Sequence, residues 1–304
     1  MALIEGALIY ANLMVLLALG LTITYITTSV PNFAQGSFAV FGSYVALTFL
    51  QICNIHPYHS LPLCFLFGGL LGLATYLIAL RPLIGRGASV VTLMIATLAW
   101  DILLLGVIGA YSGFLSSITK KSTTNFLFTP LDFPVVGLHG RLVVSSLVIL
   151  LTIVFLTFLL YKTKFGIALR ASMENPALAE IMGINVEYTR LFSWFLSGAL
   201  AGLAGGILPF KQQIFPVTGD VLIVSIFASS IVGGLSSLLG AVIGGYIVGL
   251  SESLASYALS LYFGPAILSY SKVIPLSILI ATLLIAPKGI VSIRWRRLLK
   301  WLGR

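Results

Sequence analysis

Residues 162–190, with the sequence KTKFGIALRASMENPALAEIMGINVEYTR, form a charged island between two apolar runs at 142–161 and 190–210. The island holds seven of the chain's 25 formally charged side chains, 17 basic and 8 acidic. Such a polar segment is not needed to cross a bilayer, where charged groups are costly. The pattern therefore indicates membrane-spanning runs joined by a loop that contacts something in water.

The rest of the chain is dominated by apolar residues. Of its 304 residues 59% are hydrophobic and 8% are charged, with a mean hydropathy of +1.10; a soluble domain usually has about 25% charged residues. Crossing about 30 Å of hydrocarbon takes about 20 residues, and helices satisfy their own backbone groups. The runs lack the alternation of a membrane β-barrel. They lie at 5–29, 33–50, 61–80, 88–110, 142–161, 190–210, 219–257 and 266–287.

We therefore predict an all-α, polytopic transmembrane bundle of eight or nine membrane elements, forming a single transmembrane domain over residues 1–304. The 39-residue run 219–257 is long enough to cross twice, with a break expected near Gly233-Gly-Leu-Ser-Ser237. A re-entrant path is the alternative. The first run lacks a basic leading segment and a clean cleavage site, so we expect it to be retained rather than removed as a signal peptide.

The basic residues predict the topology. Twelve of the 17 Lys and Arg lie in 81–87, 162–190 and 288–304, and the positive-inside rule places these segments in the cytoplasm. Segment 111–140, rich in turn-forming residues, then faces outside despite Lys120 and Lys121. Because the net charge of +9 lies mainly in loops and the tail, it indicates membrane topology rather than nucleic-acid binding.

The histidines and cysteines do not form the patterns of a metal site or of a catalytic triad. His56, His59 and His139 fall in predicted loops, and Cys53 and Cys64 have no Cys or His neighbours at metal-ligand spacing. We therefore predict no metal site, no nucleophilic triad and no cofactor. A Cys53–Cys64 disulfide remains one possibility, because both residues fall near one membrane edge.

Small residues recur at four-residue spacing in two segments, a pattern that lets helix backbones approach closely. We expect packing inside one subunit, with a homodimer seam as the alternative. The pairs are Gly198/Gly202, Gly202/Gly206, Gly240/Gly244 and Gly245/Gly249. Pro31-Asn-Phe-Ala-Gln-Gly36 interrupts an apolar stretch, either as a broken helix beside a solute path or as a simple turn.

Within the island, residues 175–183 predict one short helix. Asn175 can cap it, Pro176 suits its first position, and Gly183 can take the left-handed conformation that ends it. A helix this short is marginal alone in water and needs a surface to dock on. The alternative is a solvated linker.

These motifs together resemble the permeases of branched-chain amino-acid ABC importers. The spacing Gly166-x3-Arg170-Ala171-x3-Asn175-x3-Ala179-x3-Gly183-Ile184 is similar to that family's coupling loop. Asn32-Phe-Ala-Gln-Gly36 resembles its Asn-Phe-Ala-His-Gly, with Gln35 in place of His, and Gly233-Gly-Leu-Ser-Ser237 resembles its Gly-Gly-Leu-Gly-Ser, with Ser236 in place of Gly. Gly249-Leu-Ser-Glu-Ser253 and Pro287-Lys-Gly289 resemble two later signatures. The compact start is similar to the shorter of the two permease types.

The resemblance implies a multi-pass permease of a prokaryotic plasma membrane that transports branched-chain or related hydrophobic amino acids and is not itself an enzyme. It implies a second permease subunit, two cytoplasmic ATPase subunits and an external solute-binding protein as partners. The chain has no Gly-x4-Gly-Lys-Ser/Thr phosphate loop, so ATP is expected to bind elsewhere. The residues implied in ATPase coupling are Gly166, Arg170, Ala171, Asn175, Ala179 and Gly183.

Ionisable and polar residues inside the spans give the remaining hypotheses. Asp101 and Glu252 fall in or near apolar runs, where an isolated charge costs about 2.5–3.5 kcal/mol. For Glu252 we favour a structural hydrogen bond over a place on the solute path; Asp101 could pair with Lys or Arg, or gate protons. With no facing Lys or Arg expected in a span, an ion-coupled carrier or channel is the less favoured alternative. Asn32, Gln35 and Thr97 are the predicted solute-path residues.

Overall fold

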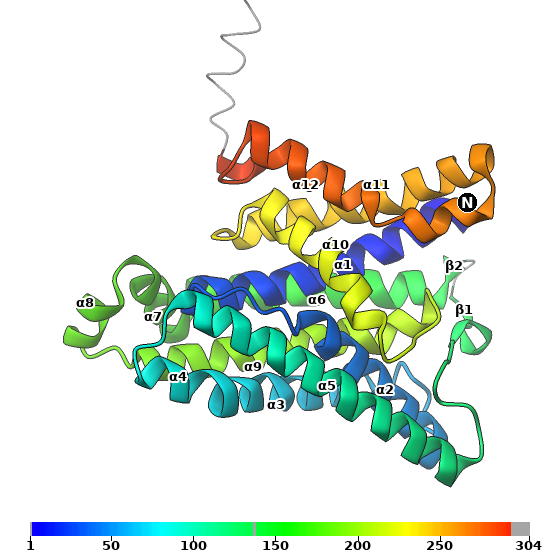
Figure 1. The fold of residues 1–304 in the computed structure, drawn as a ribbon, viewed down its shortest axis with the longest axis horizontal. Coiled ribbons are helices and arrows are strands. Elements are labelled where there is room, and N and C mark those ends of the chain that lie inside the picture. Colours follow the sequence, from blue (N-terminus) through cyan, green and yellow to red (C-terminus); the bar gives the residue numbers. More distant parts are fainter. Residues whose placement is uncertain (1, 136–137, 293–304) are drawn as a thin grey trace, which may run out of the picture.

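The computed structural model describes residues 2–135 and 138–292, and nearly all of its regular structure is helical (Figure 1). The longer helices are α1 (Ala2–Thr28), α2 (Gln35–Cys53), α3 (Leu61–Thr75), α5 (Val90–Thr119), α6 (Gly140–Lys162), α9 (Val186–Ile207), α10 (Thr218–Gly233), α11 (Leu238–Phe263) and α12 (Val273–Ile285). Short helices are α4 (Arg81–Gly85), α7 (Lys164–Glu174) and α8 (Pro176–Ile181), with the π-helical turn η1 (Tyr76–Leu80). The 3-10 segments are η2 (Thr129–Leu131), η3 (Leu208–Phe210), η4 (Pro265–Tyr270) and η5 (Ile290–Ser292).

Nine apolar elements make up the described bundle, seven of them long enough to cross a membrane and two, α10 and α12, shorter. The predicted all-α polytopic fold is thus confirmed. Run 219–257 divides as expected, because α10 ends at Gly233 and α11 begins at Leu238. Gly234 takes a φ of +107°, and the Ser237 hydroxyl caps α11 by accepting from the Gly240 amide at 3.1 Å.

Two loop boundaries were predicted wrongly. The expected loop 81–87 begins as helix, because α3, η1 and α4 run on without interruption to Gly85. The expected external segment 111–140 also begins as helix, since α5 continues to Thr119, where the left-handed Lys120 ends it. In both cases polar residues sit on a helix that extends beyond its apolar core. The sequence change marks the membrane edge rather than the helix end.

Helices α1 and α9 form the core of the bundle. In the most apolar window of α1, 89% of residues are buried, against 22% in α5 and 28% in α6. Large apolar side chains on the outer helices, such as Ile102 and Leu150, remain exposed. A surface of this kind suits lipid rather than water.

Close packing of glycines joins the inner helices. A Cβ added to Gly198 or Gly202 of α9 would overlap backbone atoms of α3, and one added to Gly245 would overlap Val15 of α1. The Gly spacing therefore serves packing within one subunit, as expected. Cys53 and Cys64 are both free thiols, the first exposed and the second buried, so the possible disulfide is not formed.

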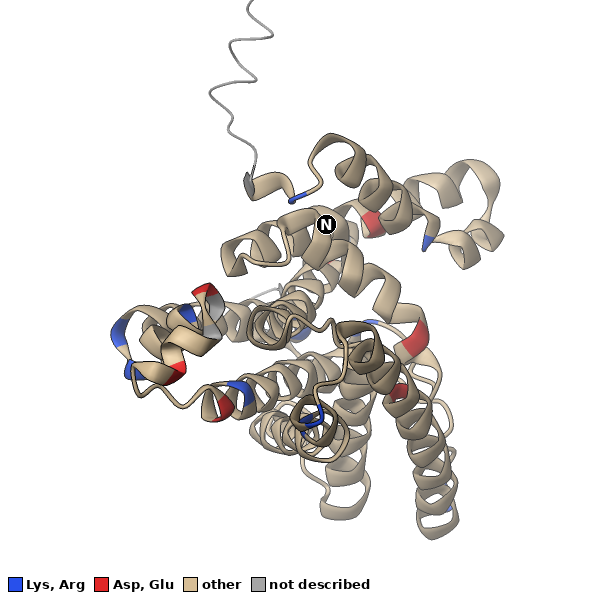
Figure 2. Cartoon of the chain, turned by 60° about the vertical axis from the view of Figure 1, so that its left-hand side comes forward, with Lys and Arg blue, Asp and Glu red and all other residues tan. Residues whose placement is uncertain are grey.

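The two ends of the bundle differ. Helices α4, α7 and α8 lie at one end, here called the α8 end, and the N-terminus lies at the other with strands β1 (Pro134–Val135) and β2 (Leu138–His139) (Figure 1). This opposite end is called the hairpin end. Charged residues are sparse within the bundle and gather on α7 and α8 (Figure 2). The basic tail used in the topology prediction, including Arg294 and Arg304, lies outside the described residues.

Candidate functional site

The charged island folds into two short helices, each started by a polar cap. The Thr163 hydroxyl accepts from the Gly166 amide at 3.4 Å at the start of α7. At the start of α8, Asn175 Oδ1 accepts from the Leu178 amide at 3.1 Å, as its sequence position predicted. Gly183 ends the segment with a φ of +82°, so the predicted helix 175–183 is present. Helix α7 was not predicted.

The six predicted coupling residues are placed differently. Gly166 lies so close to α6 that a Cβ would overlap the Leu160 backbone. Ala179 is buried, and its carbonyl accepts from the Ile184 amide at 2.9 Å. Ala171 accepts from the Asn175 amide at 3.1 Å, which joins α7 to α8. These contacts shape the segment, whereas the exposed Arg170 is available to a partner.

Helix α8 presents apolar side chains to its surroundings. Leu178 is 55% exposed and Ile181 81%, on a helix of six residues that stands off the bundle (Figure 1), and Met182, directly after its end, is 75% exposed. Arg170 of α7 is also exposed, and its guanidinium carbon lies 5.5 Å from the centroid of the Tyr161 ring at the end of α6. Apolar side chains beside charges on a protruding turn are typical of a protein-binding surface.

The predicted solute-path residues lie together at the break between α1 and α2. Asn32, Gln35 and Thr97 are fully buried. The Asn32 amide donates to Gln35 Oε1 at 3.0 Å, and the Ser197 hydroxyl of α9 donates to the same oxygen at 3.0 Å. Thr97 of α5 accepts from the Phe33 amide at 3.4 Å. Asn32, Gln35 and Ser197 therefore form one closed polar cluster, and Thr97 joins α5 to the backbone of the same break between α1 and α2.

A second buried cluster was missed from the sequence. The Lys272 ammonium donates to Glu252 at 2.6 Å, to the Ser225 hydroxyl at 2.9 Å and to the Tyr10 hydroxyl at 3.1 Å. The expectation that no Lys or Arg faces an acid within the spans was therefore wrong. Lys272 falls inside the apolar run 266–287. The free-energy cost of a lone charge in such a run was the signal that Lys272 has an ion-pair partner. Glu252 has a structural contact, as favoured.

Asp101 has different neighbours. It lies on α5, where Ser37 and Asp220 are its polar neighbours. None of the ion pairs in the described part of the chain includes it, so the suggested pairing with Lys or Arg is not seen.

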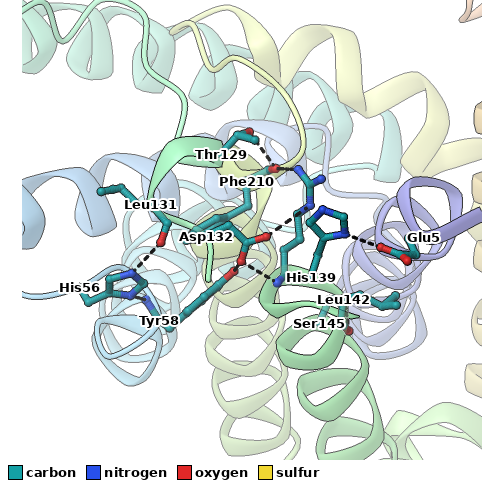
Figure 3. A network of polar contacts seen from close by, with 11 residues as sticks. Glu5, His56, Tyr58, Thr129, Leu131, Asp132, His139, Leu142, Ser145 and Phe210 are labelled. Carbon is teal, nitrogen blue, oxygen red and sulfur yellow. Dashed lines mark hydrogen bonds and ion pairs between the residues drawn. The ribbon is translucent and has the colours of Figure 1, made fainter. Parts of the chain in front are cut away.

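A polar network secures the hairpin end (Figure 3). Asp132 accepts from the Tyr58 hydroxyl at 2.7 Å and from the Arg141 amide at 3.0 Å, and Arg141 also donates to the Phe210 carbonyl at 3.0 Å. His139 contacts Glu5 at 2.5 Å. Burial, and then the Asp132 carboxylate, raise the pKa of Tyr58 well above its usual range, so its hydroxyl remains a donor. The network fixes residues 129–132 and His139 against α1, α6 and the α2–α3 and α9–α10 loops.

Comparison with known families decides the identity. The family described as the permease component of the branched-chain amino acid transport system matches residues 3–283. The chain belongs to this family. As a branched-chain amino-acid permease it is a transport component and not an enzyme, and it is a multi-pass protein of the plasma membrane.

Similar permeases match over nearly their whole length. The chain is 63% identical over 300 residues to the probable branched-chain amino acid transport permease protein LivH of Methanocaldococcus jannaschii, covering 99% of this chain and 95% of that protein. It is 27% identical over 295 residues to the high-affinity permease protein LivH of Escherichia coli K12, covering 91% and 90%. The expected likeness to the shorter permease type is thereby confirmed.

A solved structure shares the fold of the permease. PsaBC from Streptococcus pneumoniae, in complex with a Fab, aligns with a TM-score of 0.54 and 15% identity, covering 95% of this chain and 93% of that one. At this identity the likeness concerns the arrangement of helices alone.

Proposed function

We propose that the permease is the membrane-spanning subunit of an ATP-driven importer for branched-chain or related hydrophobic amino acids. Its partners in this proposal are a second permease subunit, two cytoplasmic ATPase subunits and an external solute-binding protein. The surface made by α7 and α8 carries the proposal, because it gives a separate motor a place to bind. Family membership supports the solute class.

The α8 surface fits this role physically. Ala179 anchors α8, while Leu178, Ile181 and Met182 face outward. A docked ATPase would cover these apolar side chains and supply the tertiary contact that a six-residue helix lacks alone. Because Gly166 packs directly against α6, movement of the docked helix would reach a membrane-spanning element.

The buried cluster of Asn32, Gln35 and Thr97 supports a path beside the helix break. A zwitterion needs polar partners to cross hydrocarbon, and unwound backbone beside helix ends is where transporters place them. The cluster is closed here, because Asn32 and Ser197 both donate to Gln35 Oε1 and the Thr97 hydroxyl accepts from the Phe33 amide of the same break. Passage of a solute would require α2 and α9 to separate around Gln35 and Ser197.

Reconstitution tests the proposal. In proteoliposomes that also hold the second permease and the two ATPases, with the binding protein outside, we expect L-leucine to stimulate ATP hydrolysis and to be taken up. Uptake by this chain alone, driven by an ion gradient and indifferent to ATP, would instead establish an ion-coupled carrier.

A further inference from the structure

A cavity of about 800 Å³ is lined by Leu3, Gly6 and Tyr10 of α1. This N-terminal part of α1 lies at the hairpin end of the bundle (Figure 1). Its volume lies within the range of about 300–1,000 Å³ usual for small-molecule sites. Both polar and aliphatic side chains line it. The polar ones used below are Tyr10, Lys211, Glu252, Ser256 and Lys272, and Leu3, Val221, Leu222 and Leu268 supply aliphatic surface.

The Lys272 ammonium in this cavity has no free proton. Its three N–H groups match three acceptors, on Glu252, Ser225 and Tyr10. Lys272 and Glu252 therefore form a neutral, hydrogen-bonded pair that leaves no donor for a ligand. The hydrogen-bonding group of the pair that remains without a partner is an acceptor oxygen of Glu252.

Two buried oxygens at the cavity have no partner in the described structure. They are Oε2 of Glu252, a residue only 4% exposed, and the hydroxyl of Ser256, which is 9% exposed. Glu252 and Ser256 are one helical turn apart on α11, so both lie on the same face. Burying a carboxylate oxygen without a donor costs about 1–3 kcal/mol or more. A cationic donor would satisfy both atoms.

A second cation completes the site. Lys211 also lines the cavity, and none of the described ion pairs includes it. Burial, and then the positive charge of Arg141, lower the pKa of Lys211. An anion bound beside Lys211 would stabilise the charged ammonium and so offset both effects.

We propose that this cavity binds a small zwitterion, with its ammonium on Glu252 and Ser256, its carboxylate on Lys211, and its aliphatic side chain on the apolar lining. The inference rests on the proposed function, because the zwitterion it names is the imported amino acid. The site would hold solute at the hairpin end, separate from the Asn32–Gln35–Thr97 cluster. A hydrophobic acid would contact only Lys211, and a hydrophobic amine would contact only Glu252 and Ser256.

Thiol protection tests the site directly. A cysteine placed at Ser260, which also lines the cavity, reports occupancy in the assembled complex, with Cys53 replaced by Ser and the buried Cys64 retained. We expect saturating L-leucine to slow methanethiosulfonate labelling of this cysteine at least fivefold. Leucinamide, which lacks the carboxylate, and 4-methylpentanoate, which lacks the ammonium, should protect only at much higher concentration.

Variants then assign each end of the ligand. Lys211→Met should weaken protection by L-leucine about tenfold and leave protection by leucinamide within twofold, because one charge-assisted hydrogen bond is lost. Ser256→Ala should weaken protection by leucinamide and leave that by 4-methylpentanoate unchanged. Neither variant breaks the Lys272–Glu252 pair, so folding is preserved; Glu252→Gln is the stronger but riskier change. Lys120→Met, an exposed lysine outside the cavity lining, is the matched control.

Three results of the protection assay would overturn the site. Leucine could give no protection, Lys211→Met could reduce protection by both ligands equally, or phosphatidylethanolamine nanodiscs could protect without leucine where phosphatidylglycerol nanodiscs do not. The last result would mark a lipid headgroup site. Normal leucine import with an unchanged KM in Lys211→Met would remove the site and leave the proposed function standing. Absence of leucine import by the wild-type complex would remove the proposed function itself.

Discussion

Gly183 ends the α7–α8 segment through its backbone conformation alone. Its φ is +82°, and a Cβ added there would meet nothing within 4 Å. The left-handed conformation costs a residue other than glycine about 1–2 kcal/mol, and a β-branched residue more. Any effect of substitution at this position therefore acts through the shape of the segment and not through a steric clash.

We expect Gly183→Val to uncouple transport while the protein remains folded and inserted. The strained turn would displace α8, so ATPase binding in a pull-down and leucine uptake should both fall severalfold. Gly183→Asn is the matched control, because asparagine tolerates the left-handed region. Wild-type uptake in the Val variant would show that the segment is only a linker.

Arg170 offers a test that does not change the backbone. Its side chain is exposed beside Tyr161 and makes no ion pair among the residues the structure describes. Arg170→Glu should therefore leave stability unchanged and reduce ATPase affinity about tenfold, because a like charge in an interface costs more than a kcal/mol. The control is Lys120→Glu, an equal charge reversal at the hairpin end. Similar losses in both variants would contradict a local contact.

For single residues, the sequence predicted the roles that depend only on nearby residues in the chain, such as the ends of a helix. Asn175 and Gly183 act within one or two turns, and their roles at the ends of α8 were found correctly. Lys272 and Glu252 lie on different elements of the chain. The two other residues that Lys272 contacts, Tyr10 and Ser225, are still farther from it in the sequence. No local periodicity reveals such a contact.

Helix α9 packs backbone to backbone against both α2 and α3. Gly202 fits between the Gly42 region of α2 and the Cys64 region of α3, with no space for a methyl group. We expect Gly202→Val to destabilise the permease in detergent by about 1–3 kcal/mol, the usual cost of overpacking. Gly113→Val on α5 is the control, since a Cβ there meets nothing within 4 Å. Equal melting temperatures would contradict the packing role.

The break between α1 and α2 gives a test of the solute path. Cysteines at Asn32, Gln35 and Thr97 should be protected from aqueous thiol reagents in the closed state, where all three positions are buried. They should become reactive when ATP and loaded binding protein drive the transport cycle. Cys53→Ser provides the background, because Cys53 is exposed. Protection in every transport state would place the path elsewhere.

Element boundaries show where sequence reasoning stopped. The division of run 219–257 was predicted because Gly233 and Gly234 interrupt it, and glycine there permits the φ of +107° that turns the chain. The continuation of helix from α3 into α4 was not predicted. Arg81 marks the membrane edge, but a helix can extend beyond that edge. Helix α7 was missed because its charges resemble those of a solvated loop.

In the whole molecule, the number of membrane crossings between two loops decides whether they lie on the same side of the membrane. Nine apolar elements place consecutive described loops alternately at the two ends. The α3–α5 connection and the α7–α8 segment lie at the α8 end, and the β1–β2 segment lies opposite (Figure 1). This arrangement agrees with the grouping of basic segments, although α12 has only 13 residues.

We predict that residues 81–87, 162–190 and 288–304 share the cytoplasm and that 120–139 faces outside. The basic count supports this orientation, because twelve of 17 Lys and Arg fall in the three segments. In the tail, Arg294, Arg296, Arg297 and Lys300 alternate with Trp295 and Trp301, a composition suited to the anionic inner leaflet.

Reporter fusions at Lys162, Thr123 and Arg304 measure this orientation. Alkaline phosphatase should be active only at Thr123, and a green fluorescent reporter only at Lys162 and Arg304. An outward signal at Lys162 would place α7 and α8 beyond the reach of any cytoplasmic ATPase and would contradict the proposed importer. An outward signal at Arg304 alone would leave the α8 surface available. It would instead show that one of the short elements, α10 or α12, enters and leaves the membrane on the same side.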